Sequence, residues 1–413
     1  MRIRKKLLFY VLATSSALIA AINSGFDAII TVLYIKDPWA FGIACFFVGT
    51  VIALIFSIIL SIPIKGKSIG SRVLDPSFSR IRLIRREEVK YQLLSGLGNS
   101  IYTIGYFALL SIMPDPSVIL PFTQMVILYL VIMESITEKN LPTLIEIQSS
   151  VIVTFGAILG SISLTGTVNI ESLIIVFFVI NPAWMISSIY QRKLKLLKID
   201  ERPNDSINIR LWNVTFAFII TAIIVFIFDT FNNGNHLIDG ITASFEYFNW
   251  VGFMAVLTFF SLILYIRALG FGKASVTQAI KSSSIIFAIP VSIVLSIFAI
   301  IQPFSNDPVL LLIKFIGVVL MVFGIASFAL TLVKAYVFIT LKPGFPLQET
   351  MDKLWNIRGV TRVCATAGPY DFIIKIRIRT LVKGYENVVK KLDEIEAINK
   401  YKWESVLKDW ENI

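Results

Sequence analysis

The sequence predicts an all-α membrane bundle of ten transmembrane helices with a 5+5 inverted repeat, followed by a C-terminal α+β domain of order βαββαβ. Three observations predict this architecture. Of the 413 residues, 56% are hydrophobic and 16% are charged, which leaves too little polar surface to cover a water-soluble globule. Apolar runs of about 20 residues, the length an α-helix needs to cross a bilayer, recur from Leu7 to Val333. After Lys334, alternating and amphipathic patterns replace them.

Ten apolar runs are long enough to span a lipid bilayer. Their predicted bounds are 7–34, 39–64, 91–113, 118–136, 144–164, 172–190, 211–228, 247–269, 274–298 and 309–333. The first run follows a basic segment but has no small-residue cleavage site after a short apolar core, so it is interpreted as a retained helix. The two cysteines, Cys45 and Cys364, form no pair pattern that would predict a disulfide or a metal site.

Lysine and arginine alternate in number between the segments that connect these runs. One set of segments carries twenty-one of them, and the other set carries only Lys36. The richer set comprises Arg2, Arg4, Lys5, Lys6, Lys65, Lys67, Arg72, Arg80, Arg82, Arg85, Arg86, Lys90, Lys139, Arg192, Lys193, Lys195, Lys198, Arg202, Arg210, Arg267 and Lys273. Basic segments resist translocation, so a multi-pass protein of the cell membrane with both termini in the cytoplasm is expected.

Charge and motif content argue against two other classes of function. The formal charge of +11 follows largely from the asymmetry just described, so no nucleic-acid partner is expected. Residues 65–90 are interpreted as a solvated cytoplasmic loop, with contact to anionic lipid headgroups as the alternative. No metal-ligand set, phosphate-binding glycine loop or Ser-His-Asp arrangement is present, and His236 falls in a predicted external loop. We therefore expect neither an enzyme nor a cofactor.

Two stretches about 160 residues apart resemble each other. Ala108-Leu109 before Pro116-Ser117-Val118 corresponds to Ala268-Leu269 before Ala274-Ser275-Val276. Prolines and glycine pairs recur at matching places, namely Pro121 and Pro290, Gly156 with Gly160, and Gly317 with Gly324. Each half then holds five helices, and an odd number of crossings makes the second half enter from the opposite face. The predicted domains are 1–165 and 166–334, the two transmembrane repeats, and 335–413.

These residues carry a resemblance to a known family. Ala268-Leu269 before Ala274-Ser275, Pro290, and Gly317 to Gly324 resemble the second half of the drug/metabolite transporter superfamily, EamA type. Glu134 in the segment that closes helix four resembles the family's exit from that helix, although Met133 replaces the usual glycine. The resemblance covers about residues 7–333. It implies a ten-helix exporter or exchanger of small metabolites with a substrate cavity between the halves.

Lys281 is the strongest candidate for a substrate-binding residue. It lies eight residues beyond Lys273, about 12 Å into the apolar core at roughly 1.5 Å per residue, and a charge at that depth costs several kcal/mol. We expect it to face the cavity. The polar companions expected beside it, from its own helix and from the matching depth of helix four, are Gln278, Ser282, Thr123 and Gln124. Lys314 and Arg267 are interpreted as residues near opposite faces that either reach the membrane surface or set the topology.

Further candidates come from helices one, three and six. Asp27, with Asn23 one turn earlier, can hold an ammonium group, a proton or Lys281, or it can lie near the outer interface. Three residues of helix three are spaced to share one face as a polar stripe, namely Asn99, Tyr102 and Tyr106. Asn181-Pro182 with Trp184 predicts a kink whose freed backbone groups line a binding site, or ordinary helix packing.

The tail is predicted to fold as a ferredoxin-like sandwich. Strands are expected at 336–341, 360–366, 372–379 and 401–407, and helices at 346–357 and 382–395, in the order βαββαβ. Gly359-Val360 before one strand and Gly368-Pro369-Tyr370-Asp371 before the next make residues 336–407 resemble the ligand-binding domain of the Lrp/AsnC family. The resemblance implies a homodimer or larger oligomer and a ligand near Gly368, Tyr370 and Asp371. A simple hairpin turn is the alternative.

The leading hypothesis is a secondary transporter, exporting amino acids or related small metabolites and regulated by its ligand-sensing cytoplasmic domain. The helix-turn-helix that the Lrp/AsnC family uses to bind DNA has no room between the last span and the first strand, so transcriptional control is not expected. The rival hypothesis is a membrane-anchored small-molecule sensor or oligomeric scaffold without transport.

Overall fold

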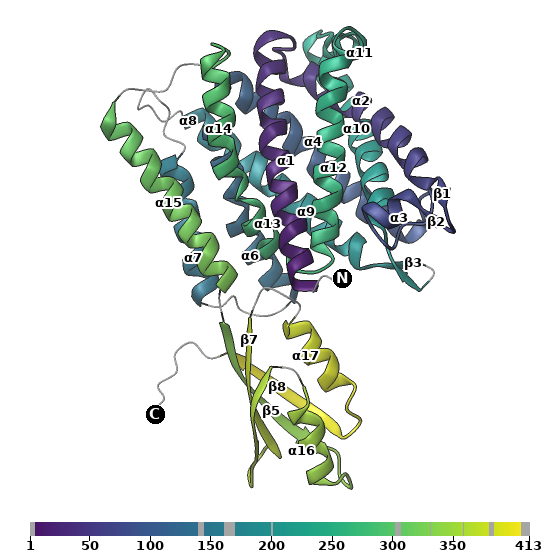
Figure 1. Ribbon diagram of the computed structural model, residues 1–413, viewed down its shortest axis with the longest axis vertical. Coiled ribbons are helices and arrows are strands. Elements are labelled where there is room, and N and C mark those ends of the chain that lie inside the picture. Colours follow the sequence, from purple (N-terminus) through teal and green to yellow (C-terminus); the bar gives the residue numbers. More distant parts are fainter. Residues whose placement is uncertain are drawn as a thin grey trace.

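The chain folds into a helical domain and a smaller tail that extends from one end of it (Figure 1). The computed structural model describes residues 5–138, 144–160, 170–199, 201–301, 307–330, 332–357, 359–379 and 384–405. Several predicted features lie outside these residues: Arg2, Arg4, Lys139, the last part of the span 144–164, the start of the helix 382–395 and the end of the strand 401–407.

The first half of the helical domain begins with two long helices joined by a short turn. Its helices are α1 (Lys5–Leu33), α2 (Pro38–Ser61), α3 (Ile69–Val73), α4 (Arg86–Ile112), α5 (Pro116–Gln124), α6 (Val126–Glu138) and α7 (Leu144–Gly160). Asp37 begins α2, because its carboxylate accepts a hydrogen bond of 2.8 Å from the Ala40 amide and Pro38 needs no donor. A hairpin of β1 (Pro63–Ile64) and β2 (Lys67–Ser68) follows α2.

The second half of the helical domain is also built of helices, but they are divided and connected differently from those of the first half. Its helices are α8 (Ile170–Ile175), the π-helix η1 (Val176–Ile180), α9 (Asn181–Leu196), α10 (Ser206–Asn232), α11 (His236–Glu246), α12 (Phe248–Leu269), α13 (Ala274–Lys281), α14 (Ser284–Ile297) and α15 (Pro308–Leu330). A second hairpin, β3 (Lys198–Ile199) with β4 (Arg202–Pro203), separates α9 from α10. The sequence placed His236 in an external loop, but in the structure it is the first residue of a helix, α11.

Seven helices among the described residues are long and apolar enough to cross a membrane. They are Leu7–Leu33, Pro38–Ser61, Arg86–Ile112, Pro116–Glu134, Ser206–Asn232, Phe248–Leu269 and Ala274–Ile297. Shorter apolar helices, Ile147–Gly156 and Pro308–Gly324, lie within two more predicted spans. The span predicted at 172–190 is divided among α8, η1 and α9. A membrane domain is therefore supported, whereas the full count of ten spans remains a prediction.

Two of the predicted spans are interrupted at corresponding places. Between α5 and α6, the Met125 amide bonds the Phe122 carbonyl at 3.3 Å, three residues back instead of four. Between α13 and α14, the Ser283 amide bonds the Ile280 carbonyl at 3.1 Å in the same tighter pattern. The prolines that sequence analysis placed in these spans, Pro121 and Pro290, lie within α5 and α14. Short tight turns inside a helix commonly mark hinges.

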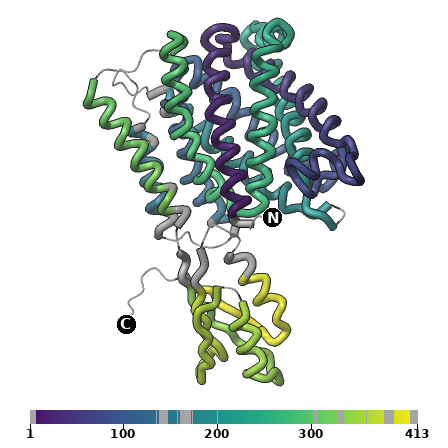
Figure 2. Tube along the Cα trace, viewed as in Figure 1, coloured from purple at the N-terminus to yellow at the C-terminus, as the bar shows by residue number. Residues whose placement is uncertain are grey.

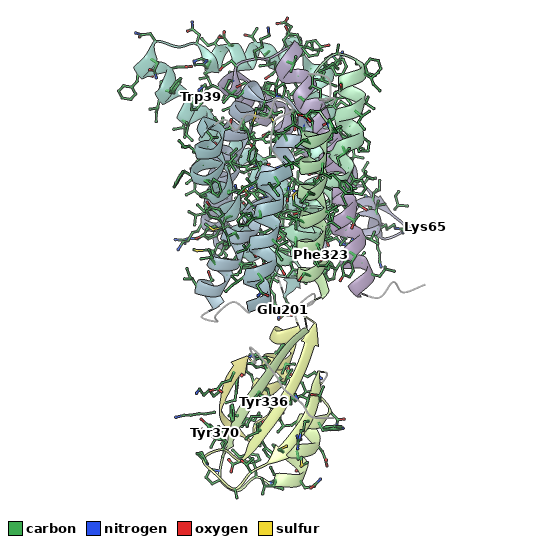
Figure 3. The ribbon with its side chains drawn as sticks, turned by 90° about the vertical axis from the view of Figure 1, so that its left-hand side faces the viewer. Trp39, Lys65, Glu201, Phe323, Tyr336 and Tyr370 are labelled. Atoms are coloured by element: carbon green, nitrogen blue, oxygen red, sulfur yellow. The ribbon has the colours of Figure 1, made fainter. Side chains whose placement is uncertain are left out.

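The predicted glycine pairs bring α7 and α15 together, and these helices lie side by side at one edge of the domain (Figure 2). A Cβ atom at Gly156 would lie 2.7 Å from the Gly317 carbonyl oxygen, and one at Gly324 would lie 3.0 Å from the Ser149 carbonyl oxygen. The helix backbones approach so closely that only glycine fits at these two positions. On its outer side α15 exposes apolar residues such as Phe323 (Figure 3).

The tail has the predicted order βαββαβ. Its elements are β5 (Leu332–Leu341), α16 (Leu347–Trp355), β6 (Val360–Ala365), β7 (Phe372–Arg379), α17 (Gly384–Asp393) and β8 (Ile398–Ser405). The four strands are antiparallel in the order β6-β7-β5-β8, which is the ferredoxin-like arrangement. Val337, Ile374 and Leu354 are among the residues of its hydrophobic core. The first strand begins at Leu332, so the last predicted span ends at Leu330 instead of Val333.

Candidate functional site

A cavity of about 130 Å³ lies within the helical domain. Helices from both halves of the chain contribute to its wall, among them α1, α4, α5 and α13. The wall contains ten of the eleven candidate substrate residues, namely Asn23, Asp27, Asn99, Tyr102, Tyr106, Thr123, Gln124, Trp184, Gln278 and Lys281. Ser282 is not in the wall, but its hydroxyl donates a hydrogen bond of 2.8 Å to Gln124 Oε1. The fold thus brings together side chains that are up to 258 positions apart in the chain.

The carboxylate of Asp27 is held by neighbours on two helices. The Asn23 amide donates to both of its oxygens, at 3.2 and 3.0 Å, and the Tyr106 hydroxyl donates to Oδ2 at 3.3 Å. Asn23 is oriented in turn by Thr258, whose hydroxyl donates to its Oδ1 at 3.1 Å. Asp27 is 5% exposed and lines the cavity. It is therefore a buried, hydrogen-bonded acid and does not lie at the surface of the domain.

Lys281 is the last residue of α13, immediately before the tight turn. Its ammonium lies 4.8 Å from the ring centre of Trp184 and 4.5 Å from that of Tyr265, so two aromatic faces stabilise the charge. Tyr265 is oriented by the Ser188 hydroxyl, to which it donates at 3.0 Å. Within the described part of the chain, no carboxylate forms an ion pair with Lys281. Its charge is thus available to a ligand in the cavity.

Amide side chains join the two interrupted helices beside Lys281. Gln278 donates to Gln124 Oε1 at 2.8 Å and accepts from the Trp184 indole at 3.3 Å. Gln124 also donates to the Thr123 hydroxyl at 3.1 Å. This network connects α5, α9 and α13 directly at the cavity wall. A movement at either tight turn therefore has to break or remake these bonds.

Asn99 and Asn181 are engaged mainly in packing between helices. The Asn99 amide donates to Asn213 Oδ1 at 3.1 Å, which joins α4 to α10. The Asn181 amide donates to the carbonyl oxygen of Val176 at 3.0 Å and to that of Phe122 at 3.3 Å. The Asn181 backbone amide donates to the same Val176 carbonyl, five residues back as in a π-helix, so Asn181 bonds that carbonyl with both its backbone and its side chain. Of the kink residues, Trp184 reaches the cavity.

Arg210 is a cavity residue that sequence reasoning missed. It was grouped with the basic loop residues, yet it is the fifth residue of α10, is 4% exposed and lines the cavity. Its hydrogen bond to Asn213 Oδ1 is long, 3.4 Å from Nη1, and among the described residues its buried Nε atom has no hydrogen-bond partner. The sequence contained a usable signal, because Asp205 is a good N-cap and its position places Arg210 inside the helix.

The starting ends of α5 and α13 are capped by side chains from other helices. At α13, Glu134 accepts hydrogen bonds from the Ala274 amide at 2.6 Å, the Ser275 amide at 3.3 Å and the Ser275 hydroxyl. Glu134 also pairs with Arg192 of α9 at 3.4 Å. The first amides of a helix have no hydrogen-bond acceptor within the helix, so a buried carboxylate there accepts their hydrogen bonds. Its negative charge also interacts favourably with the positive end of the helix dipole.

The corresponding end of α5 is capped in a related way. The Ser117 amide donates to Ser292 Oγ at 3.0 Å and to Asp115 Oδ1 at 2.8 Å. The offset that carries Ser117 onto Ser275 also carries Glu134 onto Ser292, so the two caps are reciprocal. Lys314 donates to the Ser117 hydroxyl at 3.0 Å and lies 3.7 Å from Asp115. Lys314 is therefore engaged with the segment that begins α5, and its interpretation as a residue that reaches the membrane surface stays a prediction.

A second polar cluster fixes the connections before α4 and α10. Lys195 Nζ lies 2.6 Å from Asp75 Oδ2 and donates to the Asn204 carbonyl at 2.6 Å. The amide and hydroxyl of Ser206 donate to the same Asp75 oxygen at 2.9 and 2.7 Å. Burial by itself would raise the pKa of Asp75, but Lys195 and Ser206 outweigh it and hold that pKa below its ordinary value. Arg267 joins this region by donating to the Leu74 carbonyl, so it too is structurally engaged.

In the tail, the predicted ligand residues form the turn between β6 and β7. The Asp371 carboxylate accepts a hydrogen bond of 2.6 Å from the Leu341 amide, and the Asp371 amide donates to the Ile339 carbonyl at 2.9 Å. The Tyr370 ring lies 5.1 Å from that of Phe338, in the tail and away from the helical domain (Figure 3). A Cβ atom at Gly368 would meet nothing within 4 Å. Asp371 therefore closes the turn, and the space beside Gly368 is open.

Comparison with known proteins bears on the tail. A family model described as "Lrp/AsnC ligand binding domain" matches residues 334–411. The tail is an Lrp/AsnC ligand-binding domain. No curated protein matches the chain. A solved structure described as "Crystal structure of protein" is 13% identical, covers 76% of this chain and 95% of its own, and has a TM-score of 0.46. At that similarity it carries no argument about this chain.

The described residues contain no group of three or more His, Cys, Asp or Glu side chains arranged to hold a metal ion. The cavity instead offers one carboxylate, two cations, amides, hydroxyls and aromatic faces. Groups of these kinds can bind a small molecule through charge and hydrogen bonding. The Lrp/AsnC domain and the apolar helices together support a general description of this protein as a ligand-regulated membrane protein.

Proposed function

We propose that this protein is a secondary transporter that exports amino acids or related small metabolites, and that its tail regulates transport by binding a small molecule. One observation carries the proposal. Polar and charged side chains from both halves of the chain converge on a buried cavity beside two interrupted helices, at Gln124 and at Lys281. Cavities between repeats that contain discontinuous helices are typical of secondary transporters.

The reciprocal caps support an inverted repeat as the basis of alternating access. Glu134 of α6 caps α13, while Ser292 of α14 caps α5, and α5 packs on α14 as α13 packs on α6. This crosswise packing is what two related halves threaded in opposite senses are expected to make. It agrees with the EamA-type resemblance, with ten spans and with a pathway that opens at either face in turn.

The proposed orientation places both termini in the cytoplasm. The start of α1 and the tail lie at the same end of the helical domain (Figure 1), as an even number of crossings requires. The excess of lysine and arginine in the connecting segments supports the cytoplasm as the compartment that this end faces. Reporter fusions at Arg82 and after Ser405 should report the same compartment. Different compartments for these two sites would contradict an inverted repeat with ten spans.

Proteoliposome flux tests the transport function. Lys281→Ala removes the cavity ammonium, and we expect it to abolish flux of the wild-type cargo without unfolding the protein. Lys90→Ala is the matched control, because Lys90 is an exposed residue of α4 outside the cavity. Flux at the wild-type rate in Lys281→Ala would exclude this residue from cargo binding.

A membrane-anchored sensor without transport is the second candidate, favoured by the Lrp/AsnC domain itself. Calorimetry of the full chain and of residues 331–413 with each of the twenty amino acids tests ligand binding by the tail. Binding with no flux of any small metabolite would favour the sensor. Sedimentation of the same fragment tests the proposed homodimer, for which the half-buried sheet face containing Tyr336 and Phe338 is a candidate.

A further inference from the structure

Over the described ranges of the chain, three charged side chains line the cavity, and their balance bears on the charge of the cargo. They are Asp27, Arg210 and Lys281. Asp27 is the acid of the set, and its carboxylate accepts hydrogen bonds from the neutral groups of Asn23 and Tyr106. The cavity as built therefore carries one more positive than negative formal charge. Since a buried charge without a counter-charge costs several kcal/mol, an occupant that supplies a negative charge is favoured.

Arg210 is placed to meet that negative charge. Among the residues that the structure describes, no carboxylate forms an ion pair with it, and its Nε atom is buried with no hydrogen-bond partner. Its contact with Asn213 uses only Nη1 and is long, at 3.4 Å. A guanidinium group presents five donors in a planar fork that matches a carboxylate, so most of this donor capacity is unused.

Lys281 supplies a second point of attraction from another helix of the same half, α13. The Trp184 and Tyr265 rings hold its ammonium without neutralising it. Tyr102 lies against Trp184, with 4.6 Å between ring centres, and extends the aromatic wall. The cavity therefore combines two cations with an apolar, aromatic surface. A polyamine or other cation would meet two like charges there and is disfavoured.

We infer that Arg210 and Lys281 together select a small organic carboxylate of net charge −1, such as an acidic amino acid or a 2-oxo acid, as the cargo. This inference rests on the proposed function, because it takes the cavity to be the cargo site. The carboxylate pairs with the Arg210 fork, Lys281 adds positive charge to the same cavity, and the remainder of the molecule lies along the aromatic wall. Neutral zwitterions of the same shape bind less tightly.

The experiment uses purified full-length protein and four probes. L-Glutamate and 2-oxoisovalerate carry net charge −1, L-glutamine is the neutral isostere of glutamate, and putrescine is a cation. Binding is measured by the shift in unfolding temperature with probe concentration, and transport by uptake into proteoliposomes. We expect at least one of the two anions to bind at least ten-fold more tightly than glutamine and putrescine.

Arg210→Gln should weaken anion binding at least ten-fold, and Arg210→Lys should restore part of it. Lys281→Gln gives an independent loss if Arg210→Gln fails to fold. Lys90→Gln removes an exposed charge of α4 as the matched control and should leave the affinities unchanged. Since the tail lacks Arg210 and Lys281, anion binding that survives both cavity variants belongs to the tail and overturns the inference.

The two proposals fail separately. Anion binding that depends on Arg210, with no uptake of any probe, supports the charge selection and contradicts transport. Uptake of glutamine or putrescine that is indifferent to Arg210→Gln supports transport and overturns the charge selection. Absence of binding for both anions also overturns it.

Discussion

Glu134 offers the sharpest test of how the interrupted helices are held. Its side chain is 5% exposed and accepts from the Ala274 amide at 2.6 Å and from the amide and hydroxyl of Ser275. Replacing it by alanine removes a charged acceptor from the start of α13. The amides left behind are buried and have no carbonyl of their own helix to bind.

The expected loss follows from the two shorter bonds. A hydrogen bond to a charged group contributes about 1.5–3 kcal/mol net, so two of them at the low end amount to about 3 kcal/mol. The third bond, from the Ser275 amide at 3.3 Å, is weaker and is left out of this figure. Glu134→Gln keeps an oxygen acceptor but loses the charge. We expect it to cost about 1.5 kcal/mol, half of the alanine figure, since neutral bonds contribute about half as much.

The measurement is the free energy of unfolding in detergent micelles by denaturant titration. Glu87→Ala is the matched control, because Glu87 is an exposed acid in the first turn of α4 and its loss costs at most about 1 kcal/mol. The order of stability should be wild type, then Glu134→Gln, then Glu134→Ala. A Glu134→Ala protein within about 0.5 kcal/mol of wild type would refute the cap as a stabilising contact.

Three further changes probe other parts of the molecule. Gly156→Ala should destabilise the protein by about 1–3 kcal/mol in the same titration, because its new methyl group would press on the backbone of α15, whereas Gly252→Ala, with ordinary contacts, should be tolerated. Asp75 has a lowered pKa, so its pair with Lys195 stabilises the protein above the ordinary carboxyl pKa near 4, and this stabilisation is lost as the pH falls through the pKa in the folded state. Asp75→Asn should therefore make the free energy of unfolding depend less on pH in this acidic range. An unchanged pH dependence would contradict the pairing. Asp371→Ala should lower the unfolding free energy of the tail by about 1.5–3 kcal/mol, read by tail tryptophan fluorescence, and an unchanged midpoint would show that its bond to the β5 backbone contributes little.

Hydrophobic patterning was enough to predict the general architecture. Uninterrupted apolar runs correspond to α1, α2, α4, α10 and α12, since the length of an apolar run and the length of a spanning helix have the same cause. Alternation and amphipathic spacing likewise gave the order of strands and helices in the tail. The interruptions of α5–α6 and α13–α14 were not predicted, because no glycine or proline stands at Met125 or Ser283.

Candidate residues were easier to find than their partners. Buried polar side chains such as Asp27 and Lys281 are conspicuous in apolar sequence, and they do line the cavity. Arg210 was missed because the sequence analysis assigned every basic residue between two apolar runs to a loop. Arg210 in fact lies about one turn inside α10. The cap that Glu134 places on α13 depends on a contact 140 positions away, which local spacing cannot reveal.

The way the tail is attached has a mechanical consequence. β5 begins at Leu332, almost directly after α15 ends at Leu330, and it is an inner strand of the sheet with β7 on one side and β8 on the other. A strand held along both edges cannot peel away when its helix turns. A rotation of α15 should therefore move the whole tail as a rigid unit. A tail held in place by a bound ligand or by a second tail should in turn restrict the rotation of α15.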